Sequence, residues 1–309
     1  MAMKRLLLLL KPFGVSPQPS HTHPQVLDFL NNRHKVHRDS INFCQEILRK
    51  KPVEWKAVLR DNLTQRINDV DLVVTIGGDG TLLQASHLVD DKIPILGVNS
   101  DPTRIDEVEQ FSGEFDATRS TGHLCSATVE NFEQVLDSIL EGRVAPSELT
   151  RMRISVNGLH LSTYALNDVL VAHPCPASLS RFSFRITKED QPCSPQVNCR
   201  SSGLRISTAA GSTAAMHSAG GFPMSISSRD LQYMVREPIS PAAVSDFMHG
   251  LIKHDEKMNA TWTCRKGVIY IDGSHINYTI QDGDIIEISS KAPSLKVFLP
   301  HRLLQLAKM

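Results

Sequence analysis

A short segment, Gly-Gly-Asp-Gly-Thr at residues 77–81, combines residues that could handle a phosphate group. It follows residues 70–76, a β-branched apolar run that predicts a buried strand. Glycines let the backbone turn tightly and come close to a phosphate, and a helix starting near Thr81 would add a positive partial charge. The Asp79 carboxylate could accept a proton or orient a bound metal. The alternative is a plain strand-to-helix turn with Asp79 as a helix cap.

Two later segments carry polar groups that suit a nucleotide. Leu-Asn-Asp at residues 166–168 opens an apolar run, and an amide beside a carboxylate suits two adjacent ribose hydroxyls. The stretch 200–221 is rich in small and hydroxyl residues, and Thr213 and Ser218 could hydrogen-bond a base edge or a phosphate. Alternatives are a polar turn before a strand and a small-residue helix packed against a sheet.

The elements that must position these groups change character near Pro146. Before it, apolar runs at 6–10, 70–76 and 93–98 predict strands, and they alternate with helical patterns at 25–32, 37–49, 81–88 and 129–140. Such alternation predicts an α/β domain with a parallel sheet over residues 1–146. Short alternating runs at 152–156, 166–172, 182–186, 204–208, 262–271 and 284–288 predict an all-β, β-sandwich-like domain over 147–289. The tail 290–309 would pack back on the first domain.

Composition narrows the possible partners. Lys+Arg and Asp+Glu both number 33, so the net charge of zero gives no sign of a nucleic-acid partner. The apolar run at 6–10 is too short to span a membrane, so no membrane partner is expected. The six cysteines form no zinc-type pair, and no metal site built by the protein is expected. We expect a cytoplasmic protein, or a peroxisomal one if the C-terminal Ala307-Lys308-Met309 acts as a weak targeting signal.

These motifs together resemble those of the NAD kinase family. Gly-Gly-Asp-Gly-Thr alone is similar to a superfamily that also contains diacylglycerol and sphingosine kinases. The Asn167-Asp168 pair resembles the family's Asn-Glu/Asp, and Arg-Ser-Ser-Gly-Leu at 200–204 with the small-residue stretch at 207–215 resembles its Arg-Ser-Asp-Gly-Leu and Thr-Pro-Thr-Gly-Ser-Thr-Ala-Tyr. Within the family, the chain looks most like the compact plant-type NADH kinases.

The resemblance implies an enzyme that uses ATP with Mg²⁺ to phosphorylate the adenosine-ribose 2′-hydroxyl of NADH, and more weakly of NAD⁺. Asp79 would be the catalytic base. The expected ATP-binding residues are Gly77, Gly78, Gly80 and Thr81. The expected dinucleotide-binding residues are Asn99, Asn167, Asp168, Arg200, Ser202, Thr213, Ala214 and Ser218. The family also implies a homodimer or a higher homo-oligomer.

The sequence departs from the family pattern at three places. After Asn99 the family continues into Gly-x-Leu-Gly-Phe, whereas residues 100–104 read Ser-Asp-Pro-Thr-Arg. Ser202 replaces an Asp and Ala215 replaces a Tyr. Losing the carboxylate at 202 predicts a weaker preference for the cationic nicotinamide of NAD⁺, and so favours NADH. Two alternatives remain: a lipid kinase of the diacylglycerol or sphingosine type, and a non-catalytic NAD(H)-binding sensor.

Overall fold

The fold was analysed in a computed structural model that describes residues 3–12, 23–239 and 242–306. The C-terminal Ala307-Lys308-Met309 lies outside the described residues. The chain divides into two compact units. The first contains the described residues of Met1–Ser147 together with Leu295–Gln305, and the second is built from Glu148–Ser294. Each unit is described by itself.

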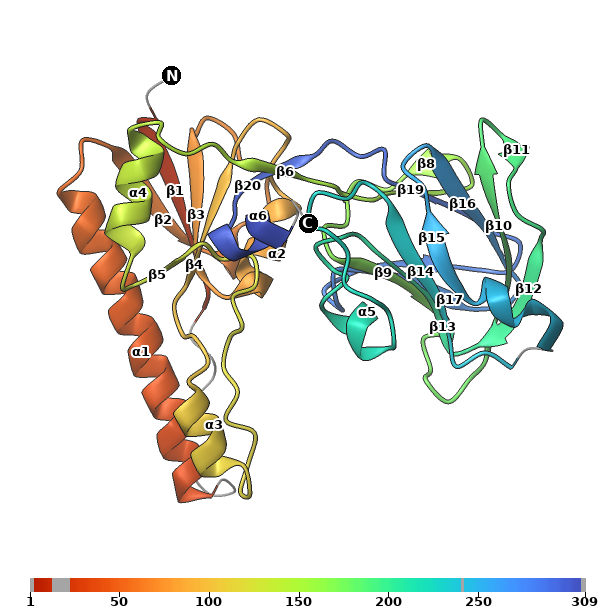
Figure 1. Cartoon of the computed structure of the whole chain (residues 1–309), viewed down its shortest axis with the longest axis horizontal. Helices are drawn as coiled ribbons and strands as arrows, with labels where there is room; N and C mark the ends of the chain where they lie inside the picture. Colours follow the sequence, from red (N-terminus) through yellow and green to blue (C-terminus); the bar gives the residue numbers. More distant parts are fainter. Residues whose placement is uncertain (1–2, 13–22, 240–241, 307–309) are drawn as a thin grey trace. The chain divides into compact units, whose positions relative to one another are not determined.

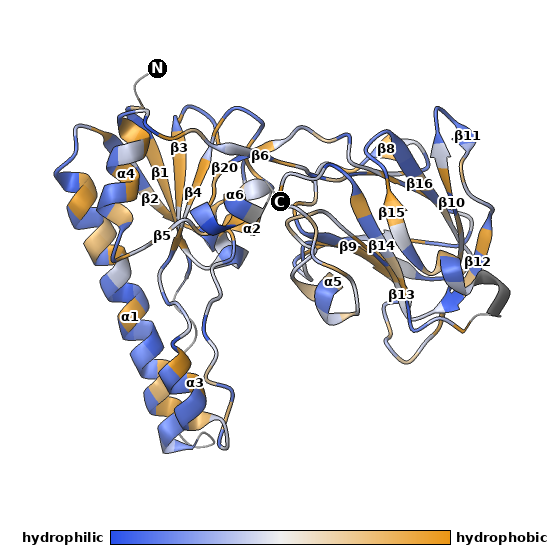
Figure 2. Cartoon of the chain, viewed as in Figure 1, coloured by the Kyte–Doolittle hydropathy of each residue, from blue (hydrophilic) through white to orange (hydrophobic). Residues whose placement is uncertain are grey.

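The first unit is built on a sheet of hydrophobic strands (Figure 1). Its strand order is β2-β1-β3-β4-β20-β6, with β5 also paired to β4. The strands are β1 (Arg5–Leu10), β2 (Glu54–Leu59), β3 (Leu72–Gly77), β4 (Ile95–Asn99), β5 (Ala127–Thr128), β6 (Ser147–Leu149) and β20 (Leu295–Phe298). The β1–β2, β1–β3, β3–β4, β4–β5 and β4–β20 pairs are parallel. This confirms the predicted α/β class, and Figure 2 shows how apolar β1, β3 and β4 are.

Helices cover this sheet on both faces. α1 (Pro24–Arg49) and α4 (Phe132–Leu140) share one hydrophobic cluster with alternate residues of β1, β3 and β4. α2 (Asp79–Ser86) packs on β3 and β4, and two shorter helices follow as α3 (Ile105–Phe111) and α6 (His301–Leu306). The two helices predicted at 25–32 and 37–49 are one continuous helix. The polar residues between them continue the helix because its buried side chains recur at helical spacing from Phe29 to Leu48.

The second unit consists of two antiparallel sheets, as predicted for an all-β domain. One sheet has the order β11-β10-β16-β19-β7-β8, with β12 paired to β10. Its strands are β7 (Arg153–Val156), β8 (Leu159–His160), β10 (Ser180–Lys188), β11 (Gln191–Pro192), β12 (Val197–Ser201), β16 (Glu256–Trp262) and β19 (Ile285–Ser289). The other has the order β15-β14-β13-β9-β17-β18. Its strands are β9 (Asp168–Ala172), β13 (Gly203–Ser207), β14 (Leu231–Arg236), β15 (His249–Ile252), β17 (Gly267–Ile271) and β18 (Ile276–Ile280).

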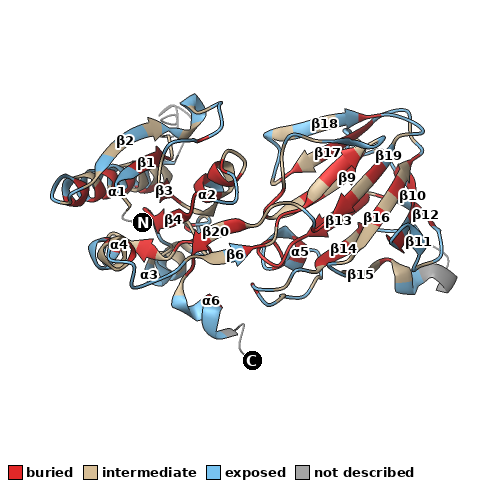
Figure 3. Ribbon diagram, turned by 90° about the horizontal axis from the view of Figure 1, so that it is seen from above, coloured by how far each residue is buried: buried red, intermediate tan, exposed pale blue. Residues whose placement is uncertain are grey.

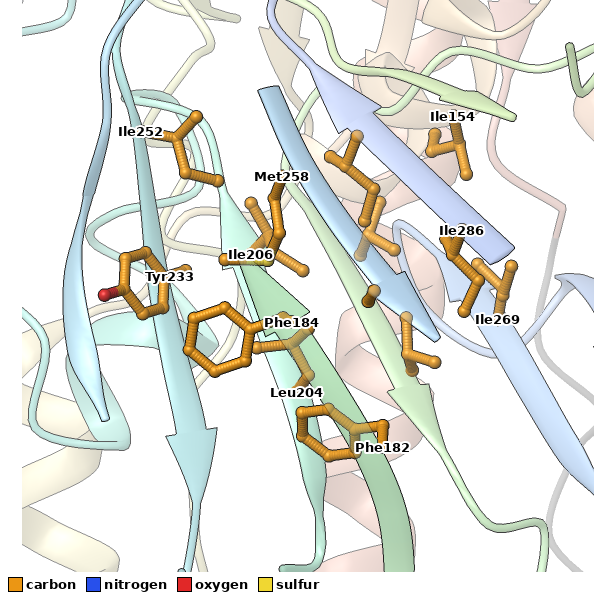
Figure 4. Close-up of a cluster of buried hydrophobic side chains, with 14 of the residues drawn as sticks. Ile154, Phe182, Phe184, Leu204, Ile206, Tyr233, Ile252, Met258, Ile269 and Ile286 are labelled. Carbon is orange, nitrogen blue, oxygen red and sulfur yellow. The ribbon is translucent and has the colours of Figure 1, made fainter. Parts of the chain in front are cut away.

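Both sheets contribute to one core, as expected for a sandwich. Phe184 and Met258 enter it from the first sheet, and Ile206, Tyr233 and Ile269 enter it from the second (Figure 4). Because side chains on a strand point alternately to the two faces of the sheet, every second residue of β9, β13 and β17 faces away from this core. Figure 3 shows the alternation as buried and half-buried segments along those strands. That outward face becomes important below.

Some predicted elements were wrong in detail. The run at 262–271 is not one strand, because Trp262 ends β16 and β17 begins only at Gly267. A β-carbon at Gly267 would stand 2.5 Å from the Trp262 ring, so glycine permits the close return of the chain. The sequence analysis did not predict β2 or α3. In the part of the chain that the structure describes, no helix is long and apolar enough to cross a membrane.

Candidate active site

The Gly-Gly-Asp-Gly-Thr segment forms a tight connection between a buried strand and a helix. Gly77 ends β3, Gly78 is the N-cap and Asp79 is the first residue of α2. A β-carbon at Gly77 would stand 2.2 Å from Thr81 Oγ1, and one at Gly78 would stand 2.2 Å from Ser120 Oγ. Both positions therefore need glycine for packing. The Thr81 N–H donates to the Gly78 carbonyl at 3.0 Å. The N–H groups of Asp79 and Gly80, which precede it, have no intrahelical acceptors, which suits them to an anion.

Asp79 does not act as a helix cap, contrary to the alternative considered from the sequence. The N-cap of α2 has no side-chain hydrogen bond. Instead, the Asp79 carboxylate accepts the backbone N–H groups of His123 at 2.7 Å and Leu124 at 2.9 Å. The Thr121 hydroxyl lies 3.3 Å from the same carboxylate. The Cys125 thiol is a fourth donor, 3.8 Å from the carboxylate. The two backbone N–H groups fix the carboxylate, and a substrate hydroxyl can take the place of one of the two longer side-chain contacts.

The loop that holds Asp79 lies beside Asn99. Asn99 ends β4, is buried, and donates through Nδ2 to the Ser120 carbonyl at 3.1 Å. A β-carbon at Gly122 would stand 2.4 Å from Asn99 Nδ2. The Gly-His-Leu segment at 122–124 is therefore next to Asn99 in space, although it is not next to it in sequence.

Residues 101–120, between Asn99 and the Gly-His-Leu segment, form an excursion that closes on itself. Its two ends are joined by Ser120 N–H to Asp101 O at 3.1 Å and by Thr103 N–H to Ser120 O at 3.1 Å. Asp101 is buried and pairs with the Arg119 guanidinium at 2.6 Å. The excursion carries α3, whose Phe111 ring packs edge-on against Phe29 of α1, and the two helices lie side by side in Figure 1.

Cationic side chains surround the glycine turn. Lys11 follows β1, and its β-carbon would lie 3.0 Å from a β-carbon at Gly77. Burial, and then the nearby Arg33, lower the pKa of Lys11. A β-carbon at Gly80 would lie 4.0 Å from Arg60 Nη1, and Arg60 Nε is buried with no hydrogen-bond partner among the described residues. Arg60 Nε also lies 3.5 Å from the exposed Asp61 carboxylate, which is a loose ion pair. Lys11 and Arg60 thus place two cationic residues next to the glycine turn.

A buried histidine supports the same region from α1. The Nε2 atom of His37 lies 2.9 Å from the Lys11 carbonyl oxygen, and its Nδ1 atom lies 2.7 Å from Ser100 Oγ. Because a carbonyl only accepts, Nε2 carries the hydrogen, and the neutral ring accepts the Ser100 hydroxyl at Nδ1. Burial lowers the pKa of His37, which favours this neutral form.

In the second unit, a hairpin turn clamps the Asn-Asp pair. The Asp272 carboxylate accepts the N–H groups of Leu166 at 2.8 Å, Asn167 at 2.7 Å and Asp168 at 2.9 Å. Asp272 follows β17 and has a φ of +50°, in the left-handed region that Asp tolerates at turns. The clamp fixes the backbone from which the Asn167 and Asp168 side chains project.

The small-residue stretch packs against the same pair. Thr208 donates its N–H to the Asn167 carbonyl at 3.0 Å and its hydroxyl to the Leu166 carbonyl. A β-carbon at Gly211 would stand 2.1 Å from the Asn167 carbonyl oxygen. The Asn-Asp pair and the small-residue stretch therefore pack together at the start of β9.

Two cavities lie on the outward face of the β9-containing sheet. One, of about 470 Å³, is lined by Asp168, Leu170, Arg205, Ala215, Tyr270, Gly273 and Ser274. The other, of about 430 Å³, is lined by Arg205, Ala215, Ser218, Ala219 and the residues 234–238. Arg205 and Ala215 line both. A small residue at 215 therefore leaves space where the family pattern has a tyrosine.

Asp168 and Arg205 form an ion pair at these cavities. Their side chains are 15% and 14% exposed, so water screens the pair only in part. Burial raises the pKa of Asp168, the Arg205 cation opposes that rise, and the nearby Asp272 adds to it. The Nε atom of Arg205 is buried with no hydrogen-bond partner among the described residues.

The remaining predicted residues fall into two groups. Thr213, Ala214 and Ser218 lie exposed on and beside α5 (Ala215–Ser218), and Ser218 lines a cavity. Arg200 is exposed on β12 of the other sheet, and Ser202 links β12 to β13, with its N–H donated to the Arg236 carbonyl at 2.9 Å. Neither Arg200 nor Ser202 lines the two cavities.

Sequence reasoning missed several residues of these sites, namely Lys11, His37, Arg60, Arg205 and Asp272. Arg205 carried one signal, since it is the single charged residue between the apolar Leu204 and Ile206 of a predicted strand. Such a residue ordinarily faces water. Among the described residues, no group of three or more His, Cys, Asp or Glu side chains could hold a metal ion.

Comparisons with known proteins agree with this geometry. Residues 15–104 match the family model described as the ATP-NAD kinase N-terminal domain. The chain is 58% identical over 315 residues to an NADH kinase of Arabidopsis thaliana, and 53% identical over 322 residues to a probable NADH kinase of Oryza sativa subsp. japonica. Each match covers 99% of both chains. The chain therefore belongs to the NAD kinase family.

Solved structures show the same fold. An NAD kinase from Archaeoglobus fulgidus, crystallised with ATP, superposes with a TM-score of 0.66 at 20% identity, covering 98% of each chain. A yeast NADH kinase, crystallised with NADH, superposes with a TM-score of 0.71 at 15% identity, covering 99% of this chain and 87% of the yeast chain.

Proposed function

We propose that the protein is an NADH kinase, which transfers the γ-phosphate of ATP to the 2′-hydroxyl of the adenosine ribose of NADH, and more weakly of NAD⁺. The observation that carries the proposal is the held carboxylate of Asp79 at the first residue of α2, beside a glycine turn that excludes side chains. The NADH kinases of Arabidopsis and rice, which the chain matches over nearly its full length, support the substrate.

In this proposal the first unit handles MgATP. The phosphates lie against the Gly77–Thr81 turn, where the N-terminal N–H groups of α2 and the Lys11 and Arg60 cations neutralise charge. Mg²⁺ enters as part of the MgATP substrate, as in other phosphoryl-transfer sites where the ion is shared with the phosphates. Asp79 removes the proton from the attacking hydroxyl as the new P–O bond forms, and ADP leaves with the electron pair of the broken bond.

The second unit holds the dinucleotide. Asp272 fixes the backbone of Asn167 and Asp168. The Asn167 side-chain amide donates and accepts hydrogen bonds with ribose hydroxyls, and the Asp168 carboxylate accepts them. Thr213 and Ser218 beside the cavities bind a base edge or a phosphate. Ala214 has a small side chain, so the dinucleotide can come close to the backbone at this position. Positioning of this kind supplies most of the rate in phosphoryl transfer, because the reaction needs little covalent help from the protein.

The direct test is steady-state phosphorylation of NADH and of NAD⁺ in parallel, with purified protein and MgATP. We expect NADPH to form with the higher specificity constant. Equal use of both dinucleotides would keep the kinase and remove the preference. No product from either, with dinucleotide binding intact, would favour the sensor alternative. Phosphorylation of diacylglycerol or sphingosine instead would favour the lipid kinase, for which the matched relatives give no support.

We also propose that the protein works as a homodimer in the cytoplasm. Light scattering coupled to gel filtration would give the mass of the particle, against 34.3 kDa for one chain. Imaging of an N-terminally tagged chain, with and without Ala307-Lys308-Met309, would separate cytoplasmic from peroxisomal residence. A monomeric mass would overturn the proposed homodimer. A peroxisomal signal that depends on the last three residues would overturn the proposed cytoplasmic location.

A further inference from the structure

The cavity-lining face of the second unit contains an arginine that the proposed function does not use. Arg205 sits on β13 between Leu170 of β9 and Met234 of β14 in the strand register. Its guanidinium bonds one oxygen of Asp168, the residue proposed to hold a ribose. Among the described residues, no other cation pairs with that carboxylate. Arg205 is therefore built into the dinucleotide-binding face.

We propose that Arg205 determines the preference for reduced over oxidised dinucleotide, by compensating the Asp168 carboxylate and so making the binding face less negative. This inference rests on the proposed function and deepens it. NADH and NAD⁺ carry the same pyrophosphate and differ by one positive charge on the nicotinamide. An added cation on the binding face therefore disfavours NAD⁺, wherever the ring lies within electrostatic range.

The local charges make Arg205 the compensating cation of this face. It pairs with Asp168, whereas the neighbouring Asp272 carboxylate is held by backbone N–H groups. Arg236, which lines the second cavity, lies 3.6 Å from the Glu237 carboxylate, and position 202 carries a neutral serine. Removal of the Arg205 charge would leave Asp168 uncompensated beside Asp272, and burial of the pair keeps water from fully masking the change.

The guanidinium has a second capacity that a point charge would lack. The Nε atom of Arg205 is buried and has no hydrogen-bond partner in the described chain. Arg205 as a residue lines both cavities. One N–H group fixes Asp168 while others remain for a ligand oxygen. A fork of this kind orients the carboxylate, so that its second oxygen is left for a ribose hydroxyl.

The test compares three variants by their specificity constants for NADH and NAD⁺ at fixed MgATP. Arg205→Met removes the charge with similar length, and we expect the NADH-to-NAD⁺ ratio to fall about threefold to tenfold for one charge acting through a partly screened face. Arg205→Lys keeps the charge and should restore most of the ratio. Arg185→Met makes the same charge change at an exposed position on β10 of the other sheet and should leave the ratio unchanged.

Calorimetric titration of NADH and NAD⁺ without ATP separates this inference from the proposed function. If the wild type binds both dinucleotides but phosphorylates neither, the kinase proposal fails, and the binding ratio still tests Arg205. A fall in the binding ratio for Arg205→Met, rescued by Arg205→Lys, supports the inference. A ratio that is unchanged in Arg205→Met, or one that moves equally in Arg185→Met, overturns it. Circular dichroism melts confirm that each variant is folded.

Discussion

Gly211 lies so close to Asn167 that a β-carbon at position 211 would stand 2.1 Å from the Asn167 carbonyl oxygen. The atoms that this β-carbon would meet are all backbone atoms of Asn167, so no flexible side chain can move to relieve the clash. The same carbonyl accepts the Thr208 N–H. The glycine therefore lets the small-residue stretch pack against the Asn167-Asp168 pair, and its role is steric.

Gly211→Ala should therefore destabilise the second unit and weaken dinucleotide binding together. Overpacking of this kind costs about 1–3 kcal/mol. Thermal melts and NADH titration would measure the two effects. Gly113→Ala is the matched control, because a β-carbon there meets nothing within 4 Å. A Gly211→Ala protein with unchanged stability and affinity would show that the stretch can shift away from Asn167.

Asp79→Asn should keep the fold and lower kcat about 10²- to 10⁴-fold, the usual contribution of a positioned general base. The amide oxygen can still accept one backbone N–H of the 121–124 loop, but the amide NH₂ faces a second donor. Rates at saturating NADH and MgATP give the measurement. Asp91→Asn, at an exposed carboxylate, is the control. Turnover within a factor of two of wild type would remove Asp79 from the chemistry.

The stability of the first unit should fall in mildly acidic solution because of His37. Its pKa in the fold lies below the ordinary 6.5, so the neutral ring is favoured by folding. The contribution of such a group to the free energy of unfolding is fully present above pH 6.5, and it is lost as the pH falls through the lowered pKa. Protonation would also take the Nδ1 acceptor away from the Ser100 hydroxyl.

Melting temperatures from pH 8 to pH 5 would measure this effect. His37→Gln keeps a polar side chain without the titration, so its melting temperature should vary less over that range. Burial also lowers the pKa of His123. The variant His123→Gln is therefore melted over the same pH range, so that the contributions of the two histidines can be compared. Identical pH profiles for wild type and His37→Gln would assign the acid sensitivity to other groups.

Ser202→Asp should move the dinucleotide preference toward NAD⁺. A carboxylate at this half-buried position restores a negative charge beside the Arg236 backbone on β14. For a single partly screened charge, the NADH-to-NAD⁺ ratio of specificity constants should fall about threefold. Ser227→Asp, exposed in a loop of the same unit, should leave that ratio alone. Because Ser202 lies outside the two cavities, its effect should be smaller than that of Arg205→Met.

The fold could be predicted from the sequence where local pattern and burial coincide. The apolar runs that became β1, β3 and β4 are buried on both faces, so they are almost wholly apolar, with Thr75 as a buried polar side chain within β3. β2 was missed because it is mostly exposed and carries Glu54 and Lys56 among its six residues. The excursion at 101–120 was missed because the Asp101–Arg119 pair that closes it is a tertiary contact.

The same distinction applies to the site. The glycine turn and the Asn-Asp pair are contiguous in sequence, and their spacing predicted them. Arg205 and Asp168 are 37 residues apart, and neither residue alone indicates the other. The Gly-His-Leu segment at 122–124 was overlooked because the intervening excursion separates it from Asn99. Only the three-dimensional contact at Gly122 shows that the two belong together.

The position of β20 has a consequence for how the chain is made. This strand pairs with β4 in the middle of the first sheet, although nearly 200 residues separate them in sequence and the second unit lies between. During synthesis the ribosome therefore releases the whole second unit before the first sheet has its full set of strands. The unit that begins the chain is the last to be completed. Until then the edge of β4 at Ile95 and Leu96, which β5 does not cover, must be shielded from other chains.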